Sequence, residues 1–285
     1  MCRLWRPGRE KTKVELAASM IRMLSACHSR RRLHVVADAA YHGRALRALP
    51  ATVTFTTRLP TSAVLYKPAP PRTGRPGRPR LKGDRLGTCA DLAARLVFRP
   101  ATVERYRRRD QVLLAQLRCL WYGSLHTRTV RVLLVRQARA NADNKPLALV
   151  TTDLTTPAED LVAHYASRWA IEYTFGETRE HLGTGQAQNR TRHAVERTVP
   201  FVLYCYTITV LWYALHGHHP QDTADRRTHS PWYVTKTEPS FADMAAKLRR
   251  VIIAARISAA DPAQPTPDEI RAVQHAWAAA STGNA

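Results

Sequence analysis

A short apolar segment that ends in an acid sets the fold class of this chain. Residues 33–38 have the sequence Leu-His-Val-Val-Ala-Asp, which is typical of a short buried strand. A turn at 41–43 and one or two helical turns over 44–49 follow, and residues 52–59 are rich in β-branched residues, as in a strand. Residues 11–27 show helical spacing of apolar side chains. This order predicts an α/β core with an acid at a strand end.

The next segment, residues 60–84, cannot form a regular core element. It contains six prolines with Gly and Arg between them: Pro60, Pro68, Pro70, Pro71, Pro76 and Pro79. Such composition predicts an extended, exposed arm. Beyond it, residues 91–95 suit a short helix, and residues 111–121, 127–137 and 146–152 suit three strands of a β meander. This middle part therefore has the character of a mostly β insertion.

The second half of the chain is predicted to be helical. Thr156 and Pro157 suit a helix start, and that helix should run to about His181 and stop at Gly183. Residues 193–216, 241–257 and 267–280 suit further helices. The most apolar run, residues 199–215, contains Tyr, Cys, Thr and Trp, and we interpret it as a buried helix rather than a membrane span.

The charge of the chain predicts a polyanionic partner. Lys and Arg number 44 against 22 Asp and Glu, which gives a net charge of +22 and an isoelectric point near 10.7. Such an excess destabilises a compact fold unless a polyanion neutralises it, and nucleic acid does so with release of counterions. A genome rich in G and C would also enrich Arg, but it would raise Asp and Glu as well.

The cysteines predict a reducing compartment. The five cysteines are scattered and form no C-x-x-C pair, so we expect free thiols rather than disulfides or a zinc site. The first residues hold no apolar leader core. Together these features predict a cytoplasmic, nucleoid-associated protein.

Two acids are candidates for chemistry. Asp38 follows a strand, where ligands bind in open α/β sheets, although a turn or helix-capping Asp is the simpler interpretation of that residue alone. Glu172 shares one expected helical stripe with Tyr165, Arg168 and Arg179. An exposed face joined by an Arg168–Glu172 ion pair explains that stripe equally well.

The spacing Tyr165-x2-Arg168-x3-Glu172-x6-Arg179 resembles the Y-x2-R-x3-E-x6-K signature of DDE transposases from bacterial insertion sequences. That group has a ribonuclease-H-like core interrupted by a β insertion. The segment Val-Val-Ala-Asp-Ala-Ala-Tyr around Asp38 and the Arg- and Pro-rich arm add to the resemblance, which covers about residues 11–257. Arg179 stands where the signature has Lys, and a guanidinium contacts phosphate differently from an ammonium.

The resemblance implies specific roles. Asp38 would be the second catalytic carboxylate and Glu172 the third, and both would hold a pair of Mg²⁺ or Mn²⁺ ions that promote DNA cleavage and strand transfer. Tyr165, Arg168 and Arg179 would contact phosphates near the cleaved end. The partners would be double-stranded DNA, both element ends and target, and a second copy of the chain in a homodimer on DNA.

The first of the three carboxylates has no counterpart, because no Asp precedes Asp38. We expect an N-terminally truncated copy in which the first core strands are missing and catalysis is incomplete. The alternative is that Asp153 or Glu177 substitutes, which would demand close placement at the same metal pair.

Several basic and aromatic groups are further candidates for DNA contact. In the arm, Gly74-Arg75-Pro76 and Gly77-Arg78-Pro79 resemble AT-hook cores, so Arg75, Arg78 and Arg80 are predicted to enter a minor groove, unless the arm is only a flexible basic linker. The arginines around Tyr106 form a second basic cluster. In relatives an insertion aromatic can stack on a flipped base, but Trp121 and Tyr122 fit a core pair better.

The predicted organisation has four parts: a partial ribonuclease-H-like core over 1–59, a β-rich insertion with the arm over 60–147, the second half of the core over 148–217, and a helical tail over 218–285. Two other functions remain open. The chain could be a basic DNA-binding protein without catalysis, or a ribonuclease-H-like nuclease without strand transfer.

Overall fold

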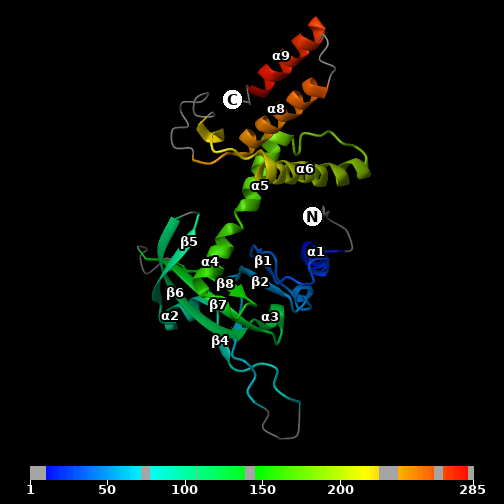
Figure 1. Ribbon diagram of the computed structural model, residues 1–285. Coiled ribbons are helices and arrows are strands. Elements are labelled where there is room, and N and C mark those ends of the chain that lie inside the picture. The colour runs from blue at the N-terminus through cyan, green and yellow to red at the C-terminus, as the bar shows by residue number, and fades with distance from the viewer. Residues whose placement is uncertain are drawn as a thin grey trace. The chain divides into compact units, whose positions relative to one another are not determined.

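The computed structural model describes residues 11–71, 78–106, 108–138, 145–224, 237–259 and 266–281. By its contacts the chain divides into two compact units. We call Leu4–Ile171 the sheet unit and Glu172–Ala285 the helical unit (Figure 1).

A single eight-stranded sheet forms the sheet unit. The strand order is β1-β2-β8-β7-β6-β3-β4, and β5 pairs with β6. Among the described strands, β1 and β2 pair in parallel and the other pairs are antiparallel. The strands are β1 (Leu33–Ala37), β2 (Val53–Arg58), β3 (Leu65–Tyr66), β4 (Arg85–Gly87), β5 (Arg99–Arg105), β6 (Arg108–Leu120), β7 (Thr129–Gln137) and β8 (Leu147–Thr151). The mixed α/β class is confirmed, and the ribonuclease-H-like core stays a prediction.

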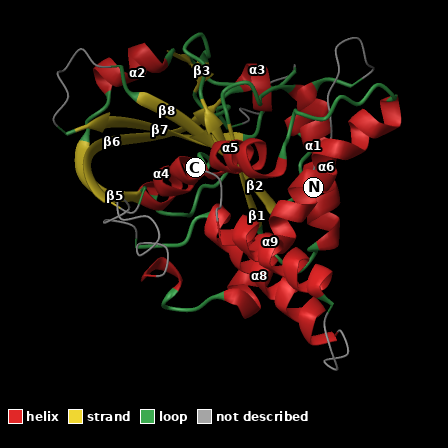
Figure 2. Cartoon of the chain, turned by 90° about the horizontal axis from the view of Figure 1, so that it is seen from above, coloured by secondary structure: helices red, strands yellow, loops and turns green. Residues whose placement is uncertain are grey.

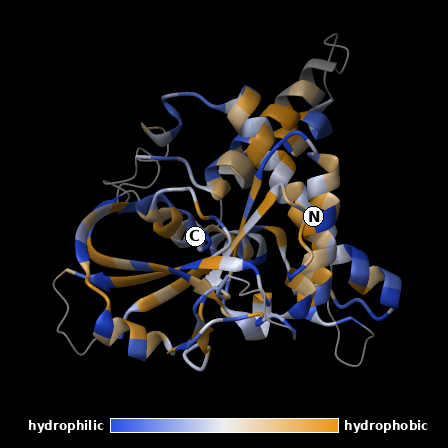
Figure 3. Ribbon diagram, turned by 90° about the horizontal axis from the view of Figure 1, so that it is seen from below, coloured by the Kyte–Doolittle hydropathy of each residue, from blue (hydrophilic) through white to orange (hydrophobic). Residues whose placement is uncertain are grey.

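Alternation along the strands builds a core on each face of this sheet. On β7, Val132 and Leu134 join one apolar cluster, whereas Leu133 joins the other. The first cluster takes side chains from α1 (Lys13–Cys27), η1 (Arg44–Leu46), α2 (Cys89–Arg95) and α3 (Tyr122–Leu125), and the second from α4 (Ala158–Ser167). Figure 2 shows α4 beside β5, and Figure 3 shows apolar stretches along the strands.

The first helix and the two strands that follow it match the prediction in position. Thr12 and Glu15 form a capping box at the start of α1, where the Thr12 hydroxyl accepts from the Glu15 backbone N–H and the Glu15 carboxylate accepts from Thr12 N–H. Ala18 and Ile21 are the buried apolar residues of this helix. β1 is half-buried along its whole length, less than the predicted burial, and it stands at one end of the strand order.

The middle part holds more strands than predicted. β6, β7 and β8 form the predicted meander, but β5 pairs with β6 over seven residues and was not predicted. The prediction that residues 60–84 hold no regular core element is wrong for their first part, because the short strand β3 lies there with Leu65 fully buried. β3 pairs with β4. All of these strands join the same sheet as β1 and β2. The predicted division into four parts stays a prediction.

The predicted long helix from Pro157 to His181 is wrong in one respect, because it is interrupted. α4 ends at Ser167, and α5 (Ala170–Leu182) begins three residues later. At the interruption, Trp169 N–H donates to Ala166 O at 3.2 Å and Ile171 N–H donates to Arg168 O at 3.2 Å, which are tight three-residue turns. Tyr165, Arg168, Glu172 and Arg179 therefore do not lie on one face of a continuous helix, as was predicted. The N-cap of α4 is Pro157, not Thr156.

The helical unit contains α5 from Glu172 onward and the elements that follow. These are α6 (Arg192–Trp212), the π-helical turn η2 (Tyr213–Gly217), α8 (Phe241–Ala259) and α9 (Pro267–Ser281). Tyr206 of α6 stacks on Phe241 of α8, with ring centroids 4.4 Å apart. Asp222 accepts from the Tyr213 hydroxyl at 2.5 Å and from Lys247 Nζ at 2.6 Å, which ties η2 to α8.

The prediction that residues 199–215 form a buried helix is wrong. The helix is present, but only 17% of its most apolar 18-residue window is buried. Among the described residues, this helix is long and apolar enough to cross a membrane by length and composition, a test that core helices of soluble proteins also pass. Burial within the described structure therefore does not explain why this helix is so apolar.

Candidate active site

Asp38 directly follows β1, as the sequence predicted. Its side chain is exposed, and Oδ1 accepts a hydrogen bond from Ala40 N–H at 2.9 Å. The Asp38 carbonyl accepts from the Thr57 hydroxyl at 2.6 Å and from Tyr41 N–H at 3.0 Å, so β2 and the turn fix the backbone. Among the described residues, Oδ2 has no hydrogen-bond partner. A rigid backbone thus presents one carboxylate oxygen to solvent at the C-terminal end of the strand.

The loop after Asp38 is anchored to α3. Gly43 N–H donates to the Ser124 hydroxyl at 2.8 Å. Arg47 reaches the same short helix twice, with Nε to Ser124 O at 2.7 Å and Nη2 to Gly123 O at 3.0 Å. Gly43 has φ +115°, which favours glycine, as the predicted turn required. The sequence did not single out Arg47 or Ser124, since their partnership spans about 80 residues of chain.

Glu172 lies in the first turn of α5 and is exposed. It begins the helical unit, whereas Asp38 belongs to the sheet unit. The expected convergence of their carboxylates therefore stays a prediction. Arg179 is also exposed on α5.

Tyr165 and Arg168, the other two residues of the signature, lie on the sheet-unit side of this boundary. The Arg168 guanidinium carbon is 5.9 Å from the Tyr165 ring centroid and 5.7 Å from the Trp169 ring centroid. These are cation–π distances. The structure thus brings Tyr165 and Arg168 together at the interruption between α4 and α5. Both residues were predicted to contact phosphate.

Asp153, one of the two acids weighed as a substitute for the missing carboxylate, acts as a cap. Its Oδ1 accepts from Thr155 N–H, the Thr155 hydroxyl and Thr156 N–H, at 2.9, 3.1 and 3.0 Å. Oδ2 accepts from the Thr156 hydroxyl at 2.8 Å. Burial opposes ionisation, but these hydrogen bonds outweigh it and lower the pKa of Asp153 to about 2. Both oxygens are thus engaged in shaping the loop before α4.

Glu177, the other acid weighed, is held within its own helix. Its Oε2 lies 3.4 Å from His181 Nε2, one helical turn further on. This is the contact expected of a helical i, i+4 pair. Oε2 is buried and makes no hydrogen bond within the described structure, so His181 is a close neighbour of this carboxylate and not a hydrogen-bonded partner.

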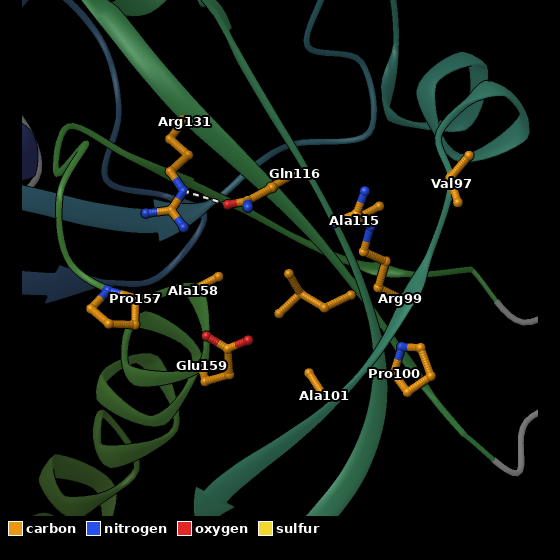
Figure 4. A pocket seen from close by; sticks show the side chains of 11 residues that line it. Val97, Arg99, Pro100, Ala101, Ala115, Gln116, Arg131, Pro157, Ala158 and Glu159 are labelled. Atoms are coloured by element: carbon orange, nitrogen blue, oxygen red, sulfur yellow. Dashed lines mark hydrogen bonds between the residues drawn. The ribbon is translucent and has the colours of Figure 1, made fainter.

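A polar group that the sequence analysis missed lies beside the start of α4. Arg131 of β7 is 9% exposed, and its Nε donates to Gln116 Oε1 at 2.8 Å and its Nη1 to Thr156 O at 2.5 Å. Figure 4 shows it at the edge of an open pocket of about 590 Å³ that Pro157 and Glu159 also line. Burial, and then the like charge of Arg118, lower the pKa of Arg131. An Arg inside an otherwise apolar strand is the sequence feature that could have indicated this buried polar group.

The described ends of the arm are fixed to the sheet unit. Lys67 N–H donates to Asp84 O, and Gly83 N–H donates to Lys67 O, each at 2.9 Å. Lys82 Nζ lies 3.8 Å from the Tyr66 ring centroid and 4.9 Å from that of Tyr122. Arg78 and Arg80 are exposed, as predicted, and Arg80 lies 3.9 Å from Asp84. Arg75 lies outside the described residues, so its predicted DNA contact stays a prediction.

Trp121 belongs to the core, as predicted, and Tyr122 lies nearer the surface. The Trp121 side chain is 5% exposed and its ring centroid is 5.3 Å from that of His42. Tyr122 is half-buried and faces Tyr66 and His126. Trp121 therefore serves to pack the Asp38 loop against α3.

The donor chemistry at the candidate acids suits a hard divalent cation. Carboxylate oxygens that are open to solvent are ligands that Mg²⁺ prefers, with water filling the remaining positions. Asp38 and Glu172 are both exposed residues, and Asp38 Oδ2 has no hydrogen-bond partner among the described residues. Within the described residues, no group of three or more His, Cys, Asp or Glu side chains is placed to hold a metal ion.

Comparison with known protein families bears on this site. A family model described as "DDE superfamily endonuclease" matches residues 6–128, somewhat less than half of the chain. The matched part contains Asp38, the arm and all of β6, and it supports a DDE transposase-like relationship. The signature around Glu172 lies beyond it. No curated protein matches the chain.

Proposed function

We propose that this chain is a transposase of a bacterial insertion sequence, of the DDE type, that acts on duplex DNA at the ends of the element and at a target. The observation that carries this proposal is Asp38. It is an exposed carboxylate on a hydrogen-bonded backbone at a strand end, within the residues matched by the endonuclease family. The Tyr165, Arg168, Glu172 and Arg179 spacing adds the second acid and three groups that suit phosphate.

In this proposal, Asp38 and Glu172 hold the divalent metal. When bound, Mg²⁺ would polarise the phosphodiester and activate the attacking water or 3′-hydroxyl. Arg168 and Arg179 would neutralise phosphate charge, and Tyr165 would donate a hydrogen bond to a phosphate oxygen. The backbone contacts of Asp38 keep its carboxylate in place before DNA arrives.

The sequence contains no aspartate ahead of Asp38. Two carboxylates hold a metal pair less completely than three, so we propose that the 285-residue chain binds duplex DNA and divalent metal but cleaves DNA weakly if at all. A homodimer on DNA is part of the same proposal.

The second candidate function is a basic DNA-binding protein without catalysis. The net charge of +22 supports that function as well as the first. The two differ in what they require of Asp38 and Glu172. A non-catalytic protein has no need of either carboxylate for binding metal.

Metal binding separates the two functions without relying on turnover. Mn²⁺ would be titrated into the full chain and free Mn²⁺ followed by its electron paramagnetic resonance signal. Asp38→Asn and Glu172→Gln should each weaken Mn²⁺ binding at least tenfold and leave DNA affinity within about threefold. Asp84→Asn, which removes an exposed carboxylate in the arm stem, is the matched control. Unchanged Mn²⁺ binding in both variants would favour the non-catalytic function.

A further inference from the structure

The hairpin formed by β5 and β6 ends in an unusual tip. We call residues 104–106 and 108–110 the hairpin tip. Arg105 pairs with Arg108, so the loop between the strands has only two residues, Tyr106 and Arg107. Tyr106 has φ +53° and is 60% exposed. Arg107 lies outside the described residues.

A tyrosine is a costly choice at this backbone conformation. Two-residue hairpin loops that need positive φ favour Asn, Asp and Gly, because a bulky side chain in the left-handed region is strained. Exposure means that burial of the ring does not offset this strain. Residues that hold such strain cluster at binding and catalytic positions, where the side chain has another task.

The tip also carries cationic side chains that form no ion pair within the described fold. Arg105 is 16% exposed in its side chain and its Nε donates to Asp110 Oδ2 at 2.6 Å, so that pair supports the hairpin itself. Arg108 and Arg109 are exposed, and within the described part of the chain no ion pair joins either one to an acid. Glu104 stands opposite Arg109 in the strand register, so part of that charge is offset.

We propose that the hairpin tip is a second contact with duplex DNA, with Arg108 and Arg109 on phosphates and the Tyr106 ring against base edges in the major groove. A two-stranded β-ribbon fits the major groove of B-DNA, and arginines flanking it reach the backbone. The exposed Tyr106 ring can pack against bases and sugars in the groove. This inference rests on the proposed function, since it takes DNA as the substrate.

Strand register relates the tip to Asp38. Ala37 of β1 pairs with Thr57 of β2, and Thr57 pairs with Val150 of β8. Val150 pairs with Val132 of β7, which pairs with Leu117 of β6, so Leu117 lies in the same row of paired residues as Ala37. The strand directions place the tip beyond the same end of the sheet as Asp38. Tyr106 lies eleven residues past Leu117, or about 37 Å along the strand at ~3.4 Å per residue. This is a length along the strand, and Leu117 itself lies four strands away from Ala37 in the strand order, so the tip contacts duplex well away from the phosphate at Asp38.

The test is DNA affinity of the full chain, measured by fluorescence anisotropy with a fluorescein-labelled 30-base-pair duplex as the probe. Tyr106→Ala and Tyr106→Gly should each weaken binding at least about fivefold, as loss of a stacked ring does, and Tyr106→Phe should bind like the unchanged chain. Tyr106→Gly should also keep or raise the melting temperature, because glycine accepts the positive φ. Tyr204→Ala is the matched control, since Tyr204 is 62% exposed on α6.

The charges are tested by salt dependence. The double variant Arg108→Ala, Arg109→Ala should reduce the slope of log affinity against log salt by about 2, or ~0.9 per lost phosphate contact. Arg30→Ala, Arg31→Ala removes an adjacent exposed pair elsewhere and should leave the slope unchanged.

Several outcomes would overturn the inference. If the unchanged chain binds the duplex and the tip variants bind equally well, the tip contact is wrong and the proposed function stands. If the double variant loses no more slope than its control, the tip arginines do not touch phosphate. If the unchanged chain fails to bind the duplex at low salt, both the inference and the proposed function fall.

Discussion

Asp153 shows how one carboxylate can shape the path of the chain from the sheet to α4. It accepts four hydrogen bonds from Thr155 and Thr156 and lies in the loop between β8 and α4. The sequence Asp-Leu-Thr-Thr-Pro contains the signal for this role, because Asp side chains bind backbone groups two and three residues on. This local pattern, and not a metal, accounts for both carboxylate oxygens of Asp153.

The lowered pKa of Asp153 makes stability depend on pH. Its native pKa of about 2 lies below the ordinary value of 3.8, so the unfolded chain takes up the proton first as pH falls. Its contribution, about 2 kcal/mol, is therefore fully present above about pH 4 and is lost as pH falls through about 2. Asp153→Asn should lower the free energy of urea unfolding by that amount at pH 7, and the difference should vanish near pH 2. The same difference at both pH values would contradict this role, and Asp84→Asn serves as the control.

Gly83 is needed where the arm rejoins the sheet. A Cβ there would lie 2.5 Å from the Pro68 carbonyl oxygen and 2.9 Å from Lys67 Cβ, and the backbone atom cannot move without breaking the stem. Gly83→Ala should therefore lower the free energy of unfolding by about 1–3 kcal/mol and speed proteolysis of the arm. Gly123→Ala, where a Cβ meets nothing within 4 Å, is the control. Equal stability of the two variants would show that the stem adjusts freely.

At the scale of elements, the strands that were predicted are those with runs of β-branched and aliphatic residues. β7 and β8 have such runs, and so does the C-terminal half of β6. β5 was missed because Arg-Pro-Ala-Thr-Val-Glu-Arg holds a proline and three charges, and its partner β6 supplies the pairing that local sequence does not. The interruption between α4 and α5 was missed because no Pro or Gly marks it, so helical periodicity continued across it.

Arg131 fixes the start of α4 against β7. Arg131→Met should remove its hydrogen bonds to Gln116 and Thr156 and lower the free energy of unfolding by about 2–3 kcal/mol. Arg118 stands opposite it, is exposed and makes one 3.2 Å hydrogen bond, to Leu154 O. Arg118→Met should change stability by less than about 1 kcal/mol, because it also relieves repulsion between the two guanidiniums. Denaturant unfolding would compare them, and a larger loss in the Arg118 variant would contradict this assignment.

At the scale of the whole molecule, sequence analysis predicted the fold class, the position of Asp38 at a strand end and the basic surface of the arm. Each of these depends on local sequence or on composition. The anchoring of the Asp38 loop by Ser124 and Arg47 depends on residues far apart in the chain, and so does the burial of Arg131. The exposure of α6 was not predicted either, because apolar content alone does not tell whether a helix finds a partner.

The central claim is that Asp38 and Glu172 hold the same metal, and cleavage of the protein by bound iron tests it most directly. Fe²⁺ would replace Mg²⁺ in the full chain bound to a 30-base-pair duplex, and ascorbate with peroxide would generate hydroxyl radicals that cut the backbone near the ion. Mass spectrometry should find cuts close to residues 38 and 172, both suppressed by excess Mg²⁺, and Asp38→Asn should abolish the cut near 172 as well. A cut near 172 that survives in Asp38→Asn, or cuts at only one of the two positions, would contradict a shared metal site.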